Sequence, residues 1–336
     1  MGISRVTLVV AILGFLFCAG ACGGGDPLDD VLYDPHPISI EIPDPSFPKL
    51  PDPPENPLTK EGIALGKRLY YDPIIDGQGN RSCGTCHLQE YSFSSGDAVL
   101  PHLNLGFDQV FLWNGAVDGS LEDAMRFEVI DFFATDVSAL NAHEEYPVLF
   151  KEAFGIENIE QEHVALALAQ FQKTVNSYNS KYDKYKRGES SFTSLEKQGE
   201  FIFFSEIGDC FHCHSAPLFK DNKIHNNGLN KHYSEIADQG HFQVSGNPLD
   251  SGKFKTPTLR NIALTAPYMH DGRFATLEEV IGFYSYGVHS NDLVDPLMKK
   301  AHNGGVALEK EEVQALVAFL HTLTDKTFIN NADFAP

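Results

Sequence analysis

Positive charge is scarce in this chain of 336 residues. It carries 25 lysine and arginine residues against 46 aspartate and glutamate residues, which gives a formal net charge of −21. A protein that binds nucleic acid needs a basic surface to neutralise phosphates, so a nucleic-acid partner is excluded. A protein partner that is itself basic is favoured instead, because opposite electrostatic fields speed the encounter.

Spare cysteine is also missing. Of the six cysteines, Cys18 and Cys22 lie near the N-terminus, and the other four belong to two Cys-x-x-Cys-His motifs at residues 83–87 and 210–214. No thiol is left for a structural disulfide, because every cysteine beyond the N-terminal region is part of a motif. The motif cysteines must therefore serve another chemistry.

The apolar run near the N-terminus, residues 6–18, is too short for a membrane-spanning helix. It follows a basic residue and precedes small residues and Cys22, so residues 1–22 are predicted to be an export signal that resembles a bacterial lipoprotein signal. We expect a periplasmic or cell-envelope protein that contacts the membrane only through a lipid anchor at Cys22. The alternative is an ordinary signal that is cleaved near Ala21.

The rest of the chain divides by composition and periodicity. Residues 23–57 are rich in proline and acidic residues and predict an extended tether. Helical periodicity dominates after them, and 336 residues are enough for two domains. We predict a mainly α fold with long loops, in which an N-terminal domain spans residues 58–188 and a C-terminal domain spans residues 189–328. Each domain contains one of the motifs.

Two helix starts are marked by capping residues. Thr59 precedes the first segment with helical periodicity, and that segment ends before Pro73. Thr193 and Glu196 form a capping-box pattern ahead of the segment that leads into the second motif. Both motifs are therefore expected to follow helices.

The Cys-x-x-Cys-His motif is typical of a covalently attached haem c. Its two cysteines lie on one helical turn and can form thioethers to the haem vinyl groups, and the histidine that follows can ligate the iron. Zinc binding and redox dithiol chemistry are the alternatives, but both motifs have the adjacent histidine and no further cysteine remains to complete a zinc site. Two haem c groups are therefore predicted. The attachment residues are Cys83, Cys86, Cys210 and Cys213, and the iron ligands are His87 and His214.

The chain resembles the bacterial di-haem cytochrome c peroxidase and MauG family in residues 57–73, in residues 256–272 and in the two motifs. The resemblance covers roughly residues 57–323. It implies two cytochrome-c-like helical domains with one haem each and a calcium ion between them. It also implies that peroxide reacts at the haem of His87 and that the haem of His214 transfers electrons.

The resemblance gives Tyr284 a special position. Family peroxidases place a methionine ligand of the second haem twelve residues after the glycine of His-Asp-Gly, and Tyr284 stands there in this chain, twelve residues after Gly272. A tyrosine at this position resembles MauG, in which the two haems store two oxidising equivalents. An anionic oxygen ligand favours the oxidised states of iron, whereas thioether sulfur does the reverse. The alternative is that Tyr284 is a core aromatic and that Met269 or Met298 ligates the iron.

Three further positions take roles from the resemblance. Trp113, the single tryptophan, lies in a segment similar to the family's Phe-Trp-Asp-Gly, in which the tryptophan relays electrons between the haems. The alternative is a buried core aromatic. Thr265 and Pro267 match positions whose backbone carbonyls bind the family's calcium ion, although the corresponding asparagine is not evident.

The chain departs from the family around the first haem. Between His87 and Trp113 it is roughly a dozen residues shorter than the family peroxidases, and the missing stretch includes the loop whose histidine caps the iron. An open iron is therefore expected. His102 is a candidate for a distal group, and the alternative is that it is a solvated loop residue.

The family's distal acid is also displaced. The glutamine and glutamate that act on peroxide fall near Ala124 and Ala134 in this chain. Because a carboxylate has to move a proton to help break the O–O bond, nearby acidic residues are the candidates, unless they are solvated carboxylates on a helix face. The predicted catalytic residues are Trp113, Glu122 and Glu128, with Asp131 and Asp136 as substitutes.

Three functions are consistent with these features. The leading one is an oxidoreductase that reduces hydrogen peroxide with electrons from a small donor, cytochrome c or a cupredoxin. The second is a MauG-like enzyme whose high-valent di-haem state oxidises a protein substrate, which Tyr284 favours. The third is an electron carrier or peroxide sensor without catalytic activity, which the displaced glutamine and glutamate favour. Family members are often dimers, so the resemblance also implies a homodimer.

Overall fold

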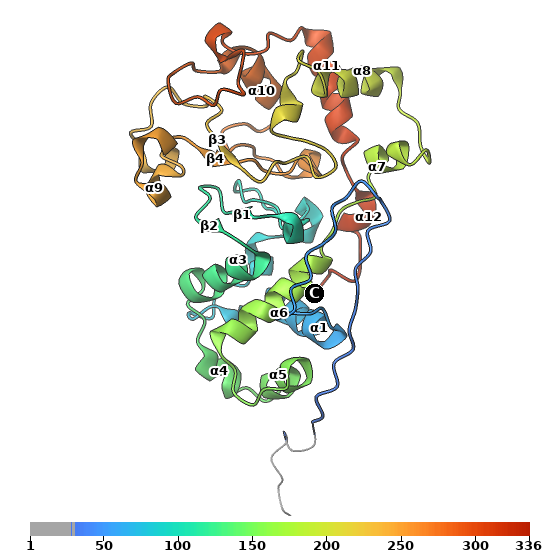
Figure 1. The fold of residues 1–336 in the computed structure, drawn as a ribbon, viewed down its shortest axis with the longest axis vertical. Coiled ribbons are helices and arrows are strands. Elements are labelled where there is room, and N and C mark those ends of the chain that lie inside the picture. Colours follow the sequence, from blue (N-terminus) through green and yellow to red (C-terminus); the bar gives the residue numbers. More distant parts are fainter. Residues whose placement is uncertain (1–27, 29–30) are drawn as a thin grey trace, which may run out of the picture.

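The computed structural model describes Leu28 and residues 31–336. The predicted export signal and the predicted anchor residue Cys22 lie outside the described residues. Figure 1 shows a mainly helical chain with long connecting loops, which confirms the predicted fold class at this level. Among the described residues, no helix combines the length and the apolar character that crossing a membrane requires.

Helices α1 (Lys60–Tyr71) and α6 (Gln161–Thr174) cross in the first half of the chain. The Thr59 hydroxyl accepts a backbone hydrogen bond from the first turn of α1, which confirms the predicted cap. The helices approach closely at Gly66, where a Cβ atom would lie 1.9 Å from the carbonyl oxygen of Ala167. The other helices of this half are α2 (Cys83–Cys86), α3 (Leu121–Phe127), α4 (Val137–Asn141) and α5 (Tyr146–Phe154).

The core of the first half also receives the C-terminal end of the chain. Phe328 of α12 (Lys326–Ile329) and Phe334 pack against the buried Phe93, with ring centroids 5.6 and 6.1 Å away. The Tyr71 hydroxyl donates a hydrogen bond to the Phe334 carbonyl oxygen at 2.6 Å. The last residues of the chain therefore pack with its first half, although they follow the second half in sequence.

The second half repeats the helix crossing. Helices α8 (Ser194–Phe203) and α11 (Lys310–His321) meet at Gly199, where a Cβ atom would lie 1.9 Å from the carbonyl oxygen of Ala315. The capping box predicted at the start of α8 is present. Buried phenylalanines fill the core around this crossing. The other helices of this half are α7 (Lys181–Lys186), α9 (Phe242–Ser245) and α10 (Leu277–Gly282).

Two short strand pairs face one another between the halves. Strand β1 (Val110–Phe111) pairs antiparallel with β2 (Val117–Asp118), and β3 (Ile224–His225) pairs antiparallel with β4 (Phe254–Lys255). Figure 1 places the first pair at the top of the lower half and the second pair at the bottom of the upper half. The N–H of the last residue of β4 donates to the carbonyl oxygen of Trp113 at 2.8 Å, so β4 is linked to the connection between β1 and β2.

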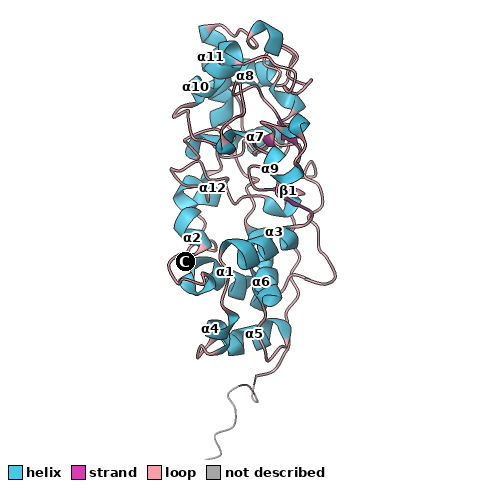
Figure 2. Cartoon of the chain, turned by 90° about the vertical axis from the view of Figure 1, so that its left-hand side faces the viewer, coloured by secondary structure: helices cyan, strands magenta, loops and turns pink. Residues whose placement is uncertain are grey.

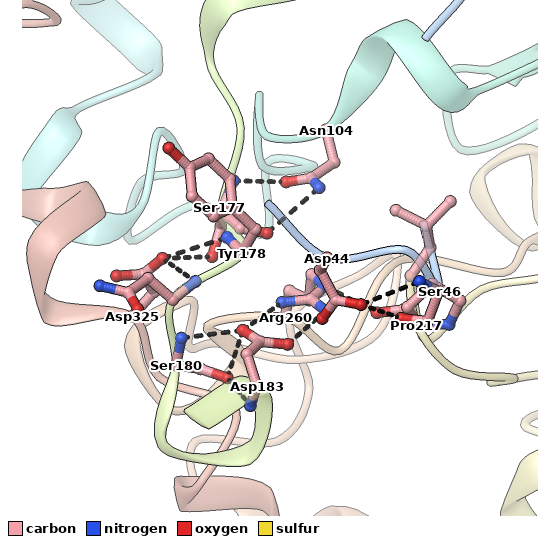
Figure 3. Close-up of polar contacts among 12 residues, drawn as sticks. Asp44, Ser46, Asn104, Ser177, Tyr178, Ser180, Asp183, Pro217, Arg260 and Asp325 are labelled. Carbon is pink, nitrogen blue, oxygen red and sulfur yellow. Dashed lines mark hydrogen bonds and ion pairs between the residues drawn. The ribbon is translucent and has the colours of Figure 1, made fainter. Parts of the chain in front are cut away.

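Buried polar side chains hold the segment that joins the halves (Figure 3). The Asn104 side-chain oxygen accepts a hydrogen bond from the Ser177 N–H at 2.8 Å, and Asp325 accepts one from the same segment at 2.9 Å. Further along, Arg260 donates two hydrogen bonds to Asp183, at 3.0 and 2.9 Å. Figure 2 shows the two halves stacked along the long axis. Each half has its own core, while the exact domain boundaries stay a prediction.

Candidate functional site

The first motif itself forms a short helix. Ser82 and Thr85 form a capping box on α2 (Cys83–Cys86), and His87 ends the helix. The His87 Nδ1–H donates to the Phe93 carbonyl oxygen at 2.9 Å, and burial lowers the pKa of His87 to about 4. The imidazole is therefore neutral, and its Nε2 lone pair is available to a metal.

The histidine of the second motif makes the same kind of hydrogen bond. A tight turn at Cys210–His212 precedes His214, whose Nδ1–H donates to the Phe219 carbonyl oxygen at 3.1 Å. Burial lowers the pKa of His214 as well. Phe93 and Phe219 both have a left-handed backbone, with φ angles of 57° and 53°. The same uncommon conformation thus supplies the carbonyl acceptor in both halves, and sequence reasoning missed it.

A mostly apolar cavity adjoins the second motif and is therefore named the second cavity. Its wall includes both motif cysteines together with His214, and the thiols of all four motif cysteines are free. Two thiols and a neutral imidazole beside one apolar cavity fit a covalently attached haem c, because the thiols can form thioethers while the imidazole ligates iron. The first motif offers the same set of donor atoms in Cys83, Cys86 and His87.

Tyr284 reaches this cavity from a π-helix at Phe283–Gly287. Burial raises the pKa of Tyr284 to about 12. Its hydroxyl oxygen accepts a hydrogen bond from Asn227 Nδ2 at 3.0 Å, and the same nitrogen lies 3.8 Å from the sulfur of Met269. Met298 also lines the cavity. All three predicted ligand residues therefore line the cavity, and the choice among them stays a prediction.

Trp113 lies where the two halves meet. It lines the same cavity and also a shallower surface pocket that it shares with Phe254 and His270. Its indole N–H donates to the Ala98 carbonyl oxygen at 2.9 Å. The Trp113 carbonyl accepts the N–H of Lys255 from the second half, so this residue has hydrogen bonds on both sides of the junction.

Glu122 is part of a buried ion pair. It lies at the start of α3 and is 4% exposed. One of its carboxylate oxygens accepts hydrogen bonds from Lys173 Nζ at 2.5 Å and from Asn56 Nδ2 at 3.0 Å. These contacts give Glu122 a structural role, because they neutralise a charge that would otherwise be costly in the core.

Glu128 has different surroundings. It begins the π-helix Glu128–Phe132 that follows α3, and such segments often occur at functional sites. Burial raises the pKa of Glu128 to about 7. The pKa of Cys83 is raised by burial and then by the charge of Glu128, which places this carboxylate close to the first motif. A carboxyl group that exchanges protons near neutral pH beside the motif has the property required of an acid–base residue.

His102 lies against the predicted iron ligand of the first motif. Its ring stacks on the ring of His87 at a centroid distance of 3.3 Å and an angle of 14°. Its Nδ1 is 3.1 Å from Gln172 Nε2 and 3.3 Å from the Tyr70 hydroxyl. Its backbone N–H donates to the Phe93 carbonyl, which also accepts from His87. The role of His102 as a distal group stays a prediction.

Thr265 and Pro267 both line the second cavity. The Thr265 hydroxyl donates to the Ile262 carbonyl oxygen at 3.2 Å. A calcium ion at these two residues stays a prediction.

A buried charge cluster between the halves was not predicted. Lys220 and Lys255 both pair with the carboxylate of Asp108, and Lys255 Nζ lies 3.1 Å from it. The three side chains are at most 4% exposed. Burial lowers the pKa of Lys255 to about 8. The sequence carries no local signal for this cluster, because Asp108 is more than a hundred residues from either lysine along the chain.

Comparison with known families matches residues 60–191 to a model described as di-haem cytochrome c peroxidase. The methylamine utilization protein MauG of Methylorubrum extorquens is 34% identical over 297 residues, which cover 82% of this chain and 81% of that protein. The cytochrome-c peroxidase IdrP1 of Pseudomonas sp. strain SCT is 30% identical over 369 residues, which cover 95% of this chain and 92% of that protein.

Solved structures give the same result. A MauG-like protein associated with microbial copper homeostasis superposes with a TM-score of 0.81 at 32% identity, covering 89% of this chain and 99% of that one. The di-haem peroxidase BthA of Burkholderia thailandensis has a TM-score of 0.66 at 20% identity, covering 85% of this chain and 90% of its own. At that identity the second likeness concerns the fold alone.

Proposed function

Because this chain belongs to the di-haem cytochrome c peroxidase and MauG family, we propose that it is a di-haem c-type oxidoreductase that reduces hydrogen peroxide with electrons from a small donor protein. The observation that carries the proposal is the paired geometry of the two motifs. In each of them a partly buried histidine donates its Nδ1–H to a phenylalanine carbonyl and keeps Nε2 free. The haems, once attached, supply the redox chemistry at iron.

Proton transfer at the first site is assigned to Glu128. With a pKa raised to about 7, this carboxyl group can accept a proton from hydrogen peroxide and return it to the departing oxygen at neutral pH. Glu122 is not assigned this role, because its carboxylate is already paired with Lys173. The catalytic roles predicted from the sequence therefore reduce to Glu128 as acid–base residue and Trp113 as electron relay.

Electrons are proposed to enter through the second half and to pass Trp113 on the way to the first. The position of Trp113 supports this route, because it lines the second cavity and is hydrogen-bonded to both halves. A small cytochrome c is the favoured donor, and a cupredoxin is the alternative. The net charge of −21 favours a donor with a basic surface.

A second function is MauG-like oxidation of a protein substrate. The specific observation in its favour is that a tyrosine oxygen, that of Tyr284, lies on the wall of the second cavity beside the two methionines. An oxygen ligand would stabilise oxidised iron and so favour oxidation of a difficult substrate. The similarity to MauG and to a MauG-like protein associated with copper homeostasis points in the same direction.

Four further features are part of the proposal. The protein is exported to the periplasm or cell envelope and is anchored by lipid at Cys22. Its two halves are cytochrome-c-like domains, at residues 58–188 and 189–328, with one haem each. Calcium binds the backbone carbonyls of Thr265 and Pro267. The protein forms a homodimer.

The test is an electron paramagnetic resonance spectrum of the purified ferric protein before and after stoichiometric hydrogen peroxide. We expect a high-spin and a low-spin signal, with the high-spin signal consumed by peroxide, because the first iron would have an open position. Steady-state reduction of peroxide with reduced cytochrome c should accompany this change. Two low-spin signals that are indifferent to peroxide, before and after partial reduction, would leave an electron carrier as the function.

A further inference from the structure

Asn227 contacts two of the three side chains that are candidates for the distal ligand of the second haem. Its Nδ2 nitrogen lies 3.0 Å from the hydroxyl oxygen of Tyr284 and 3.8 Å from the sulfur of Met269. All three residues line the same cavity as His214. An amide nitrogen carries two hydrogens, so it can serve both neighbours at once.

The orientation of this amide is fixed by its own loop. The Asn227 side-chain oxygen accepts a hydrogen bond from the Leu229 N–H at 3.2 Å, which turns the NH₂ group toward Tyr284 and Met269. The preceding residue, Asn226, is fully buried. Its side chain donates to the Ser251 carbonyl oxygen at 2.9 Å, and its own carbonyl accepts the Asp295 N–H at 2.9 Å. The donor at Asn227 is therefore pre-oriented.

The backbone of Tyr284 is held independently of Asn227. Its carbonyl oxygen accepts the Val306 N–H at 2.9 Å, and the next residue, Ser285, donates its hydroxyl to the Ile281 carbonyl oxygen at 2.7 Å. The π-helical turn thus delivers the phenol to the cavity. These backbone contacts leave open the direction in which the Tyr284 hydroxyl oxygen points within the cavity.

We propose that Asn227 is a positioning residue that selects Tyr284 over Met269 as the distal ligand of the His214 haem. An N–H group is a strong donor to oxygen and a weak partner for thioether sulfur, which agrees with contacts of 3.0 and 3.8 Å. One N–H orients the Tyr284 oxygen, and the other occupies the Met269 sulfur. The inference rests on the proposed di-haem function and adds how the choice of ligand is made.

The test replaces Asn227 by leucine, which has a similar size and no donor. In the variant we expect the methionine–iron charge-transfer band to appear in the ferric spectrum and the potential of the second haem to shift upward, because sulfur favours reduced iron more than oxygen does. Asn230→Leu is the matched control on the same loop, since the Asn230 side chain accepts from Arg273 at 2.8 Å. The control should leave spectrum and potential unchanged.

Unchanged spectra and potential in Asn227→Leu would overturn the proposal. If that variant loses haem, Asn227→Asp, which keeps the shape but not the donor, should give the same change of ligand. Tyr284→Phe distinguishes a failure of this ligand proposal from a failure of the proposed function. A low-spin signal that is unaffected by Tyr284→Phe would overturn the selection of tyrosine, whereas peroxide reduction by the native protein would still support the proposed function.

Discussion

Two acidic side chains on consecutive helical segments illustrate how environment decides the role of a residue. Glu122 is buried and Glu128 is partly buried near α3, but only Glu122 has a cation, Lys173, within hydrogen-bonding distance. Burial without such a partner raises the pKa of Glu128 to about 7. One carboxylate is therefore suited to hold the core together, and the other is suited to exchange protons.

Replacing Glu128 by glutamine tests the second role. Its carboxylate form, which accepts a proton from peroxide, accumulates as the pH rises through about 7. We therefore expect kcat/KM for peroxide to rise with pH in the native protein. Glu128→Gln should lower it by roughly 10²–10⁴-fold and remove the pH dependence. Steady-state kinetics across this pH range measures both effects.

The stability of the same variant is the control. A raised pKa means that the folded protein binds the Glu128 proton more tightly than the unfolded chain does, so this group lowers stability as pH rises from the ordinary carboxyl range through about 7. Glu128→Gln lacks this effect and should be at least as stable as the native protein at alkaline pH. If the variant is less stable than the native protein, its lower kcat/KM reflects a folding defect and not the loss of a proton-transfer group.

Lys173→Met tests the first role. It leaves the Glu122 carboxylate buried without its cation, and breaking a buried pair costs about 3–5 kcal/mol. Denaturant unfolding of the haem protein should show this loss, and the double variant with Glu122→Leu should recover most of it. Native-like stability of Lys173→Met would contradict a buried ion pair. The pH profile for peroxide should not change.

At the scale of elements, each half contains a helix crossing of the same type. Gly66 in α1 and Gly199 in α8 each approach a carbonyl of the partner helix, and Phe171 and Phe319 follow one turn beyond the contact. The paired carbonyl acceptors at Phe93 and Phe219 repeat in the same way. Both motifs therefore have the same local surroundings, a helix crossing at a glycine and a phenylalanine carbonyl that accepts from the histidine.

Alanine at either crossing glycine should therefore be destabilising. A Cβ atom at Gly66 or Gly199 would lie 1.9 Å from a backbone oxygen, so the helices have to separate. We expect a loss of about 1–3 kcal/mol in the free energy of unfolding for each variant. Gly282 in α10 is the matched control, since nothing lies within 4 Å of an added Cβ. Gly282→Ala should be neutral or stabilising by about 0.5–1 kcal/mol.

At the scale of the whole molecule, the C-terminal end of the chain packs against the first half. The polypeptide completes the second half with α11 and then packs Phe328 and Phe334 into the first core. Asp325, just before this segment, accepts hydrogen bonds from the connection between the halves. The two halves are therefore joined by a second covalent route and not only by the connection around residue 180.

Phe328→Ala tests this joint. Its side chain is 3% exposed, so its removal leaves a cavity beside Phe93 and should cost about 3–5 kcal/mol. Limited proteolysis should then cut the first half faster than the second. Phe201→Ala, at a side chain that is 63% exposed, should change stability by no more than about 0.5 kcal/mol. Equal effects of the two substitutions would contradict the packing described.

The sequence by itself determined the helical class, the capped helix starts and the two Cys-x-x-Cys-His motifs, because each depends on residues a few positions apart. Thr59 and Thr193 cap the helices they were expected to cap for this reason. Family resemblance added Trp113 and Tyr284, whose roles as relay and ligand remain predictions. Both residues lie on the wall of the second cavity, beside His214.

Only the tertiary structure decided which side chains meet. The pairing of Glu122 with Lys173 joins residues 51 positions apart, and the contact of Asn227 with Tyr284 joins residues 57 positions apart. The stacking of His102 on His87 likewise follows from the packing of a loop that has no periodic pattern. Desolvation and hydrogen bonding act through space, so the raised pKa of Glu128 and the contact of Asn227 with Tyr284 become visible only when the chain is folded.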